Sequence, residues 1–172
     1  MDKYSMKKLA LLTLALMPHL ALAATPNFGP WQFFSGRTPA NTPICSVLSD
    51  GSVNQSVRNV AIKQIGGHQS IQVTLYKDTW SIPRGTKVPV RIDFEDDQPL
   101  HLSAYGDGKI VDIEIPTQIM AIFLSLVASE RNLHIGFPAG KEAEWVIGLS
   151  SSKPVVQKLV GCMRRLESTQ PF

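Results

Sequence analysis

The sequence predicts one domain that is mainly β, with two helices, in a β-sandwich or open-barrel arrangement of α+β character. Short segments in which apolar and polar residues alternate recur between turn signals at intervals of roughly 8–12 residues. Two segments depart from this alternation and place their apolar residues at helical spacing instead. The chain has 172 residues, and a single domain of this size can bury a core of its own.

Strands are predicted wherever side chains alternate with a period of two. Ser70–Tyr76 shows this most clearly, because Ile71, Val73 and Leu75 fall on one face. The other predicted strands are 45–48, 57–65, 88–94, 100–105, 110–115, 132–137 and 145–149. Pro89 indicates an edge position or a bulge, since proline has no N–H to donate to a neighbouring strand. Turn residues separate these segments at 49–52, 66–67, 83–85, 95–98, 106–108 and 138–140.

Two helices are predicted in the second half of the chain. The first covers Thr117–Glu130, with Thr117 as a candidate N-cap after Pro116. The second begins at Ser151 or Ser152. Its predicted apolar face consists of Val155, Val156, Leu159, Val160 and Met163.

The first 23 residues are typical of a cleavable export signal. Three lysines lie among the first eight residues, an apolar run follows over Leu9–Leu16, and Ala21-Leu22-Ala23 forms a small-residue cleavage site. Either Met1 or Met6 as the start preserves this pattern. We therefore expect a periplasmic or secreted protein with a signal peptide over 1–23. An irregular arm over 24–43, a β-rich domain over 44–166 and a tail over 167–172 would follow.

The net charge of the chain does not point to a negatively charged partner such as nucleic acid. The whole chain has 17 Lys and Arg against 14 Asp and Glu, a net charge of +3. Residues 1–23 contain three Lys and one Asp, so the remainder has a net charge of only +1. This balance gives no support for nucleic acid or an anionic membrane as a partner.

The chain contains two cysteines, Cys45 and Cys162. In an exported protein a disulfide is the default interpretation, and it would tie the first strand of the domain to the last helix. Pairing between two chains stays open. The alternative is a reactive thiol at Cys162, whose pKa Lys158, Arg164 and Arg165 would lower if they pointed at it.

The sequence contains no complete catalytic or cofactor motif. Phosphate-binding and dinucleotide-binding glycine loops are absent, and Ser150–Lys153 matches a Ser-x-x-Lys pattern without the partner motifs of that enzyme class. His68, His101 and His134 are isolated in sequence, although the last two could meet in space beside Asp93 or Asp107. The acidic segment 95–97 lacks the spacing of a calcium loop. We expect no cofactor and no bound metal.

An exposed sheet edge with aromatic residues nearby is the remaining candidate for a functional surface, although aromatic residues of this kind more often belong to the core. A β domain can bind a partner by adding a strand to its edge or through an aromatic pocket. The candidate partner-binding residues are Trp31, Phe33, Phe34 and Trp80, and Trp145 is a further aromatic candidate.

Two segments resemble a known family. Trp80–Val90, with its apolar-Pro-x-Gly-x-x-Val-x-Val pattern, is similar to a stretch of the invasion-associated locus B-like proteins of proteobacteria, and Trp145–Ser150 followed by a closing helix resembles that family's end. Cys45 near the start of the domain also fits. The resemblance implies a small exported β-sandwich-like protein linked to host-cell interaction, without an established enzyme activity. It implies no functional residue.

Three classes of function follow from these observations. The first is a non-enzymatic binding protein of the bacterial envelope whose partner is another protein, in the envelope or on a host surface. The second is an inhibitor or immunity-type protein directed at a periplasmic enzyme. The third is a small hydrolase with a non-standard site, which would require a deep polar pocket holding His101 or His134 beside a carboxylate.

Overall fold

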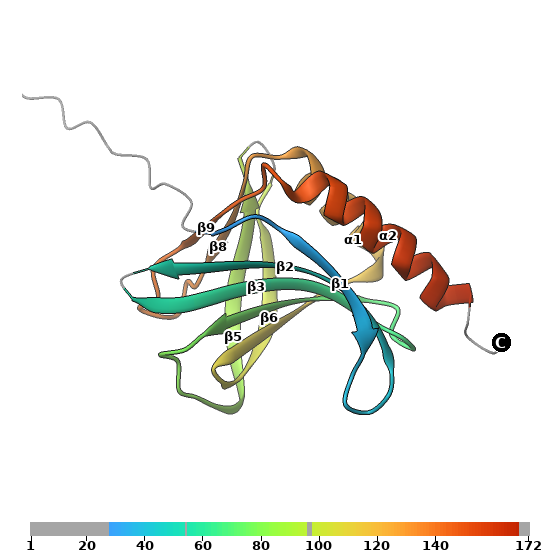
Figure 1. The fold of residues 1–172 in the computed structure, drawn as a ribbon. Coiled ribbons are helices and arrows are strands. Elements are labelled where there is room, and N and C mark those ends of the chain that lie inside the picture. The colour runs from blue at the N-terminus through green and yellow to red at the C-terminus, as the bar shows by residue number, and fades with distance from the viewer. Residues whose placement is uncertain (1–27, 54, 96–97, 169–172) are drawn as a thin grey trace, which may run out of the picture.

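The described part of the chain is a single curled antiparallel sheet with two helices (Figure 1). It comes from a computed structural model that describes residues 28–53, 55–95 and 98–168. The expected signal peptide, residues 24–27 of the arm and residues 169–172 of the tail lie outside these residues. The prediction of a mainly β domain with two helices is confirmed, and the single sheet corresponds to the open-barrel alternative.

The strands follow one another across the sheet in the order β1-β2-β3-β4-β7-β6-β5-β8-β9. Their bounds are β1 Gln32–Arg37, β2 Pro43–Val53, β3 Ser56–Ile65, β4 Ile71–Lys77, β5 Ile82–Phe94, β6 Leu100–Gly108, β7 Ile110–Ile115, β8 Asn132–Gly136 and β9 Trp145–Gly148. The helices are α1 Thr117–Ser129 and α2 Ser152–Ser168.

The core lies on the concave face of the sheet. Alternation sends every second side chain to this face, so Ile71, Val73 and Leu75 of β4 are fully buried, as the sequence predicts. Neighbouring strands contribute Val60, Ile62, Val111, Ile113, Val90, Ile92, Leu133, Ile135 and Ile147 in the same way. The concave face is therefore one continuous apolar surface along most of its length.

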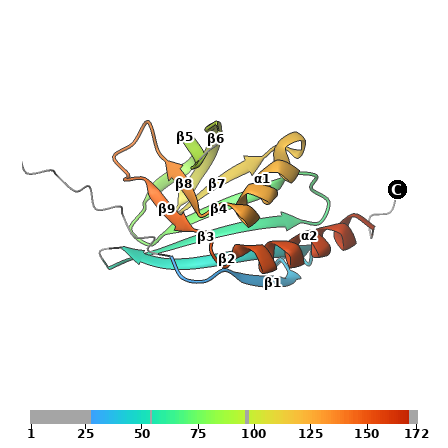
Figure 2. The same cartoon turned by 90° about the horizontal axis from the view of Figure 1, so that it is seen from above.

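Both helices lie side by side over one end of the curled sheet (Figures 1 and 2). The bond between Cys45 of β2 and Cys162 of α2 holds the second helix in place and joins positions 117 residues apart. The predicted disulfide is thus confirmed, and it closes within one chain. Among the described residues, neither helix is long and apolar enough to cross a membrane.

In the described part of the chain, neither helix covers the opposite end of the sheet. Antiparallel pairing brings the start of β3, the end of β4 and the segment 137–144 between β8 and β9 to this side. We call it the open end, and define it by Arg58, Lys77, Trp80 and this segment.

The two edges of the sheet approach each other near the first described residues. Trp31, just before β1, donates its indole Nε1–H to the carbonyl of Gly148 at the end of β9 over 2.9 Å. Its backbone N–H donates to the Ser151 hydroxyl over 3.0 Å. The sheet is thus tied across its edges by a side chain, without a continuous strand ladder.

We expect Trp31→Phe to lower the free energy of unfolding by at least about 1 kcal/mol, because the indole donor is lost and the smaller ring also loses some packing. Urea unfolding followed by far-UV circular dichroism would measure this. Gln32→Ala, an exposed neighbour in β1, is the matched control and should change little. Equal stability of all three proteins would contradict a role for this hydrogen bond in tying the edges.

The arm expected to be irregular over 24–43 differs from that expectation, because it contains β1. Every residue of β1 is exposed or half-buried. Its sequence therefore shows no alternation of apolar and polar residues. Its conformation depends on backbone pairing with β2, from Gln32 opposite Leu48 to Arg37 opposite Pro43. Backbone pairing of this kind cannot be predicted from the residues of β1 alone.

Three predicted turns are strand instead. Asp50 and Gly51 continue β2, paired with Asn59 and Arg58 of β3, and 106–108 belongs to β6. The segment 83–85 is part of β5, where a register shift between Ile82 and Thr86 forms a bulge. Gly85 takes a φ of 77° there, which an L side chain rarely adopts.

Two predictions about single residues have different outcomes. Pro89 pairs with Ser103 of β6, while the ladder to β8 begins only at Arg91, so the proline has no strand partner on its other side. This agrees with the predicted local edge. Thr117 is not the N-cap of α1: Pro116 is at that position, and the Thr117 hydroxyl donates to the carbonyl of Gln69.

Candidate functional site

Two basic side chains face the core at the open end. Arg58 is two residues before the buried Val60, and Lys77 is two residues after the buried Leu75, so alternation places both on the concave face. Arg58 and Lys77 are also direct partners across β3 and β4. Like charges directly opposite each other destabilise a strand pair, so this position requires an anion between them.

The Glu142 carboxylate supplies that anion. Oε1 is 3.2 Å from an Arg58 terminal nitrogen and Oε2 is 2.7 Å from Lys77 Nζ. Two indoles add donors, with Trp145 Nε1 at 2.9 Å from Oε1 and Trp80 Nε1 at 3.2 Å from Oε2. We call the four side chains that surround this carboxylate, Arg58, Lys77, Trp80 and Trp145, the carboxylate cradle.

Aromatic packing makes the cradle rigid. The rings of Trp80 and Trp145 stack with centroids 5.3 Å apart and planes 18° apart, and Phe137 meets both edge-on. Phe28 packs against the Trp145 ring, and the Arg58 guanidinium carbon lies 4.9 Å from that ring's centroid. The two indole N–H groups are thus held in position by ring contacts that do not involve Glu142.

Glu142 is ionised at neutral pH. Burial by itself would raise the pKa of this carboxyl, since desolvation disfavours the charged form. Hydrogen bonds from Lys77, Trp145 and Trp80, together with the positive charge of Lys77, outweigh burial and hold the pKa below its ordinary value. The cradle is therefore an environment that stabilises a carboxylate in its charged form.

The single negative charge of Glu142 does not neutralise the two positive charges of the cradle. It faces two cations, which leaves an excess of one positive charge around Glu142. Arg58 is 9% exposed, and its Nε is buried without a hydrogen-bond partner in the described part of the chain. Such a group is uncommon, because an unpaired buried donor is unfavourable.

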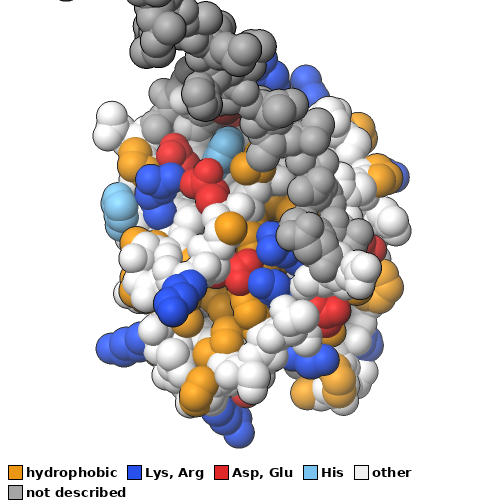
Figure 3. Space-filling view, turned by 90° about the vertical axis from the view of Figure 1, so that its left-hand side faces the viewer, with side chains coloured by type: hydrophobic (Ala, Val, Ile, Leu, Met, Phe, Trp, Pro, Cys, Tyr) orange, Lys and Arg blue, Asp and Glu red, His pale blue; other side chains and the backbone are white. Residues whose placement is uncertain are grey.

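A cavity of about 350 Å³ adjoins Glu142 at the open end. Its walls are largely apolar and come from the turn between β4 and β5, from β5 and β7, and from the loop after β8: Trp80, Ile82, Val88, Val111 and Phe137. Lys87 and Lys141 also line it and are exposed. Figure 3 looks onto this end and shows hydrophobic side chains at the surface between basic and acidic ones.

The four predicted partner-binding aromatics do not form one surface. Trp31 is 4% exposed and belongs to the core, whereas Phe34 on β1 is 61% exposed. Phe33 is partly buried against the core. Trp80 alone of the four belongs to the cradle.

The three charged residues of this site, Arg58, Lys77 and Glu142, were missed by sequence reasoning, although a signal for the first two exists. A basic residue in phase with buried positions of a strand, such as Arg58 with Val60 and Ile62, indicates a charge directed at the core. Lys77 is in phase with Leu75 in the same way. Glu142 lies in a loop and carries no such pattern, so only the tertiary structure places it here.

The histidines do not form a buried site. His68 and His101 are exposed. His134 Nδ1 lies 3.2 Å from Glu144 Oε2, but on the convex face of β8, and Arg91 also binds Glu144. Within the ranges that the structure describes, no three His, Cys, Asp or Glu side chains come together as metal ligands.

The remaining polar motifs have structural partners. Ser152 donates its hydroxyl to the carbonyls of Val127 and Leu149, which joins the end of α1 to the start of α2. Of the acidic segment 95–97, Glu95 binds Arg131 and Asn132. Asp96 and Asp97 lie outside the described residues.

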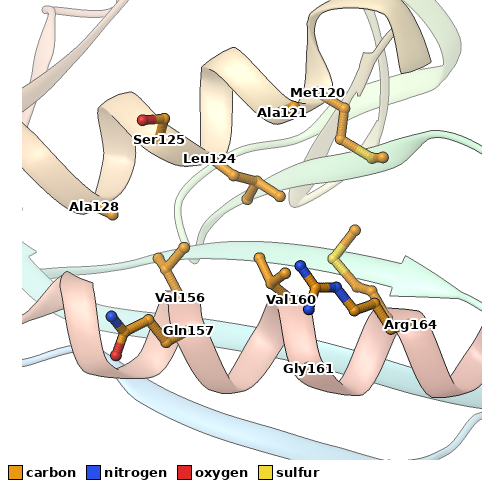
Figure 4. A pocket seen from close by; sticks show the side chains of 11 residues that line it. Met120, Ala121, Leu124, Ser125, Ala128, Val156, Gln157, Val160, Gly161 and Arg164 are labelled. Atoms are coloured by element: carbon orange, nitrogen blue, oxygen red, sulfur yellow. The ribbon is translucent and has the colours of Figure 1, made fainter.

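A second cavity, of about 610 Å³, lies between the two helices. Figure 4 shows Leu124 of α1 facing Val156 and Val160 of α2 across it, with Arg164 at one side. Its lining is mainly apolar, and it holds no cluster of opposed charges like that of the cradle. The open end therefore combines more groups able to recognise a ligand.

No protein-family model, curated protein or solved structure matches this chain.

Proposed function

We propose that this chain is a non-enzymatic binding protein of the bacterial envelope, periplasmic or secreted, and that it takes its partner at the open end of the sheet. The single observation that carries the proposal is the carboxylate cradle beside an apolar cavity. Ligand sites commonly combine apolar walls with a few convergent polar groups and reach this cavity's size. The excess positive charge favours an acidic or anionic partner.

Location outside the cytoplasm is supported by the disulfide between Cys45 and Cys162, because such bonds persist mainly in oxidising compartments. The signal-like pattern of residues 1–23 points in the same direction. A partner protein in the envelope or on a host surface fits the expectation from the sequence. Lys87 and Lys141 would meet its acidic groups at the rim of the cavity.

A charge-reversal pull-down tests the site. The oxidised domain and a Lys87→Glu/Lys141→Glu variant are immobilised and exposed to envelope and host-cell fractions. Both lysines are exposed, so the variant should keep its fold. We expect the wild-type domain to retain a partner that the variant loses.

Phe34→Ser is the matched control for this experiment, because it changes an exposed aromatic on β1, away from the open end. It should retain the partner. Loss of the partner with Phe34→Ser and retention with the lysine variant would place binding at the edge strand and overturn the open-end site. Absence of any retained partner would overturn the binding function.

A further inference from the structure

Glu142 separates the apolar cavity from the buried cations. The cavity is lined by Glu142 but not by Arg58 or Lys77, whereas the Glu142 carboxylate lies against both of these cations. Withdrawal of this one side chain would join the cavity to the cradle. The resulting site would have apolar walls and, at its inner end, two cations and two indole N–H donors.

The cations and indoles do not depend on Glu142 for their positions. Arg58 and Lys77 are placed by the pairing of β3 with β4. Trp80 and Trp145 are placed by stacking on each other and on Phe137. The cradle is thus prearranged for a carboxylate, whether that carboxylate comes from Glu142 or from another molecule.

Most residues of the segment that carries Glu142 are exposed. Pro138, Ala139, Gly140 and Lys141 are exposed, and the backbone hydrogen bond from Gly140 N–H to the Phe137 carbonyl closes a local turn. Residues 138–141 have little burial and therefore open at lower free energy than the core strands, so the contacts of Glu142 are what this opening has to replace. Its other charged anchor, Glu144, binds Arg91 and His134 on the convex face and does not enter the cradle.

From these observations we propose that Glu142 is a built-in ligand, and that the site takes in its place an apolar molecule bearing a single carboxylate. The ligand carboxylate takes over the ion pair with Arg58 and the hydrogen bonds from Lys77, Trp80 and Trp145. Its apolar body fills the cavity while residues 138–143 move outward and Phe137 stays against the indoles. The buried, unpartnered Arg58 Nε and the excess positive charge further favour an anion here. This inference rests on the proposed binding function and specifies its ligand class.

Two sources could supply such a group: a free carboxylic acid, or the C-terminal residue of a partner protein when that residue is apolar. Octanoate represents the first source, and a blocked tripeptide ending in leucine with a free carboxylate represents the second. Octanol and the amidated tripeptide are the neutral counterparts. Calorimetry on the oxidised domain measures all four, and tighter binding of one acid than the other identifies the source.

The decisive variants remove the built-in ligand. We expect Glu142→Ala to bind at least one of the acids about tenfold more tightly than the wild-type protein does, because the competing carboxylate is gone. Neither neutral counterpart should gain. Glu144→Ala, in the same segment but outside the cradle, is the matched control and should bind like the wild type. Adding Lys77→Met to Glu142→Ala should abolish the gain.

A purely structural Glu142 predicts the opposite pattern. In that case Glu142→Ala gains no affinity for either acid, and that result would overturn the inference. Should Glu142→Ala fail to fold by circular dichroism, Glu142→Gln replaces it, with the same expectation in the same direction. If neither acid binds to any of these proteins, but the pull-down with the Lys87→Glu/Lys141→Glu variant gives its expected result, the proposed ligand class is wrong and the binding function stands. If both fail, both proposals are overturned.

Discussion

Removing the disulfide should lower the free energy of unfolding by up to about 5 kcal/mol, the entropic value for a closed loop of this length. Cys45 and Cys162 are 117 residues apart in sequence, so the bond strongly restricts the unfolded chain. It also holds α2 against β2 at the helix-covered end. Urea unfolding of oxidised wild type against Cys45→Ala/Cys162→Ala would measure the difference.

The choice of alanine in that experiment has a physical reason. Cys45 is fully buried and Cys162 nearly so, and serine hydroxyls at these positions would add the unfavourable burial of polar groups. Wild-type protein kept under reducing conditions is the companion measurement, because its side chains are unchanged apart from the bond. A loss below about 1 kcal/mol in both would contradict a major stabilising role for the crosslink.

The second large effect is expected at Trp145. Its side chain is 1% exposed, and it contacts Trp80, Phe28 and Phe137 at the centre of the open-end aromatic cluster. Trp145→Ala should therefore lower the free energy of unfolding by about 3–5 kcal/mol, the usual range for a buried aromatic replaced by alanine. Far-UV circular dichroism in urea is the suitable readout, since tryptophan fluorescence changes with the substitution itself.

Trp145→Phe separates ring packing from hydrogen bonding. It keeps an aromatic ring in the cluster but removes the donor to Glu142 Oε1. We expect it to be clearly more stable than Trp145→Ala and less stable than wild type, by about 1 kcal/mol for the lost hydrogen bond together with some loss of packing. Equal destabilisation by the two variants would show that the indole donor, not ring packing, dominates at this position.

Much of the secondary structure is readable from the sequence because its cause is local. Ile71, Val73 and Leu75 are predicted to share one face of a strand, and all three are buried. The helix expected over 117–130 is present as α1, Thr117–Ser129. In both cases the residues that show the pattern are close neighbours along the chain.

Other parts of the fold are not readable in this way. No residue of β1 is buried, and the strand exists through its pairing with β2. Asp50 and Gly51 look like turn residues but continue β2, because β3 offers a partner opposite each of them. Pairing with a distant strand outweighs local turn preference at these positions.

Some residues of the candidate site can also be predicted from the sequence, and others cannot. Trp80 is an aromatic candidate in the sequence, and the inward phase of Arg58 and Lys77 can be read from their strands. The arrival of Glu142 between them depends on a loop 65 residues beyond Lys77. No local pattern encodes that approach.

The sequence by itself therefore determined which apolar side chains of the alternating strands face the core, that the chain has one pair of cysteines, and that strands dominate, because alternation and composition are properties of neighbouring residues. Only the tertiary structure decided the strand order, the pairing of the cysteines within one chain and the meeting of Arg58, Lys77 and Glu142. These depend on contacts between segments far apart in the chain. Their free energy is gained only when the whole sheet closes around its core.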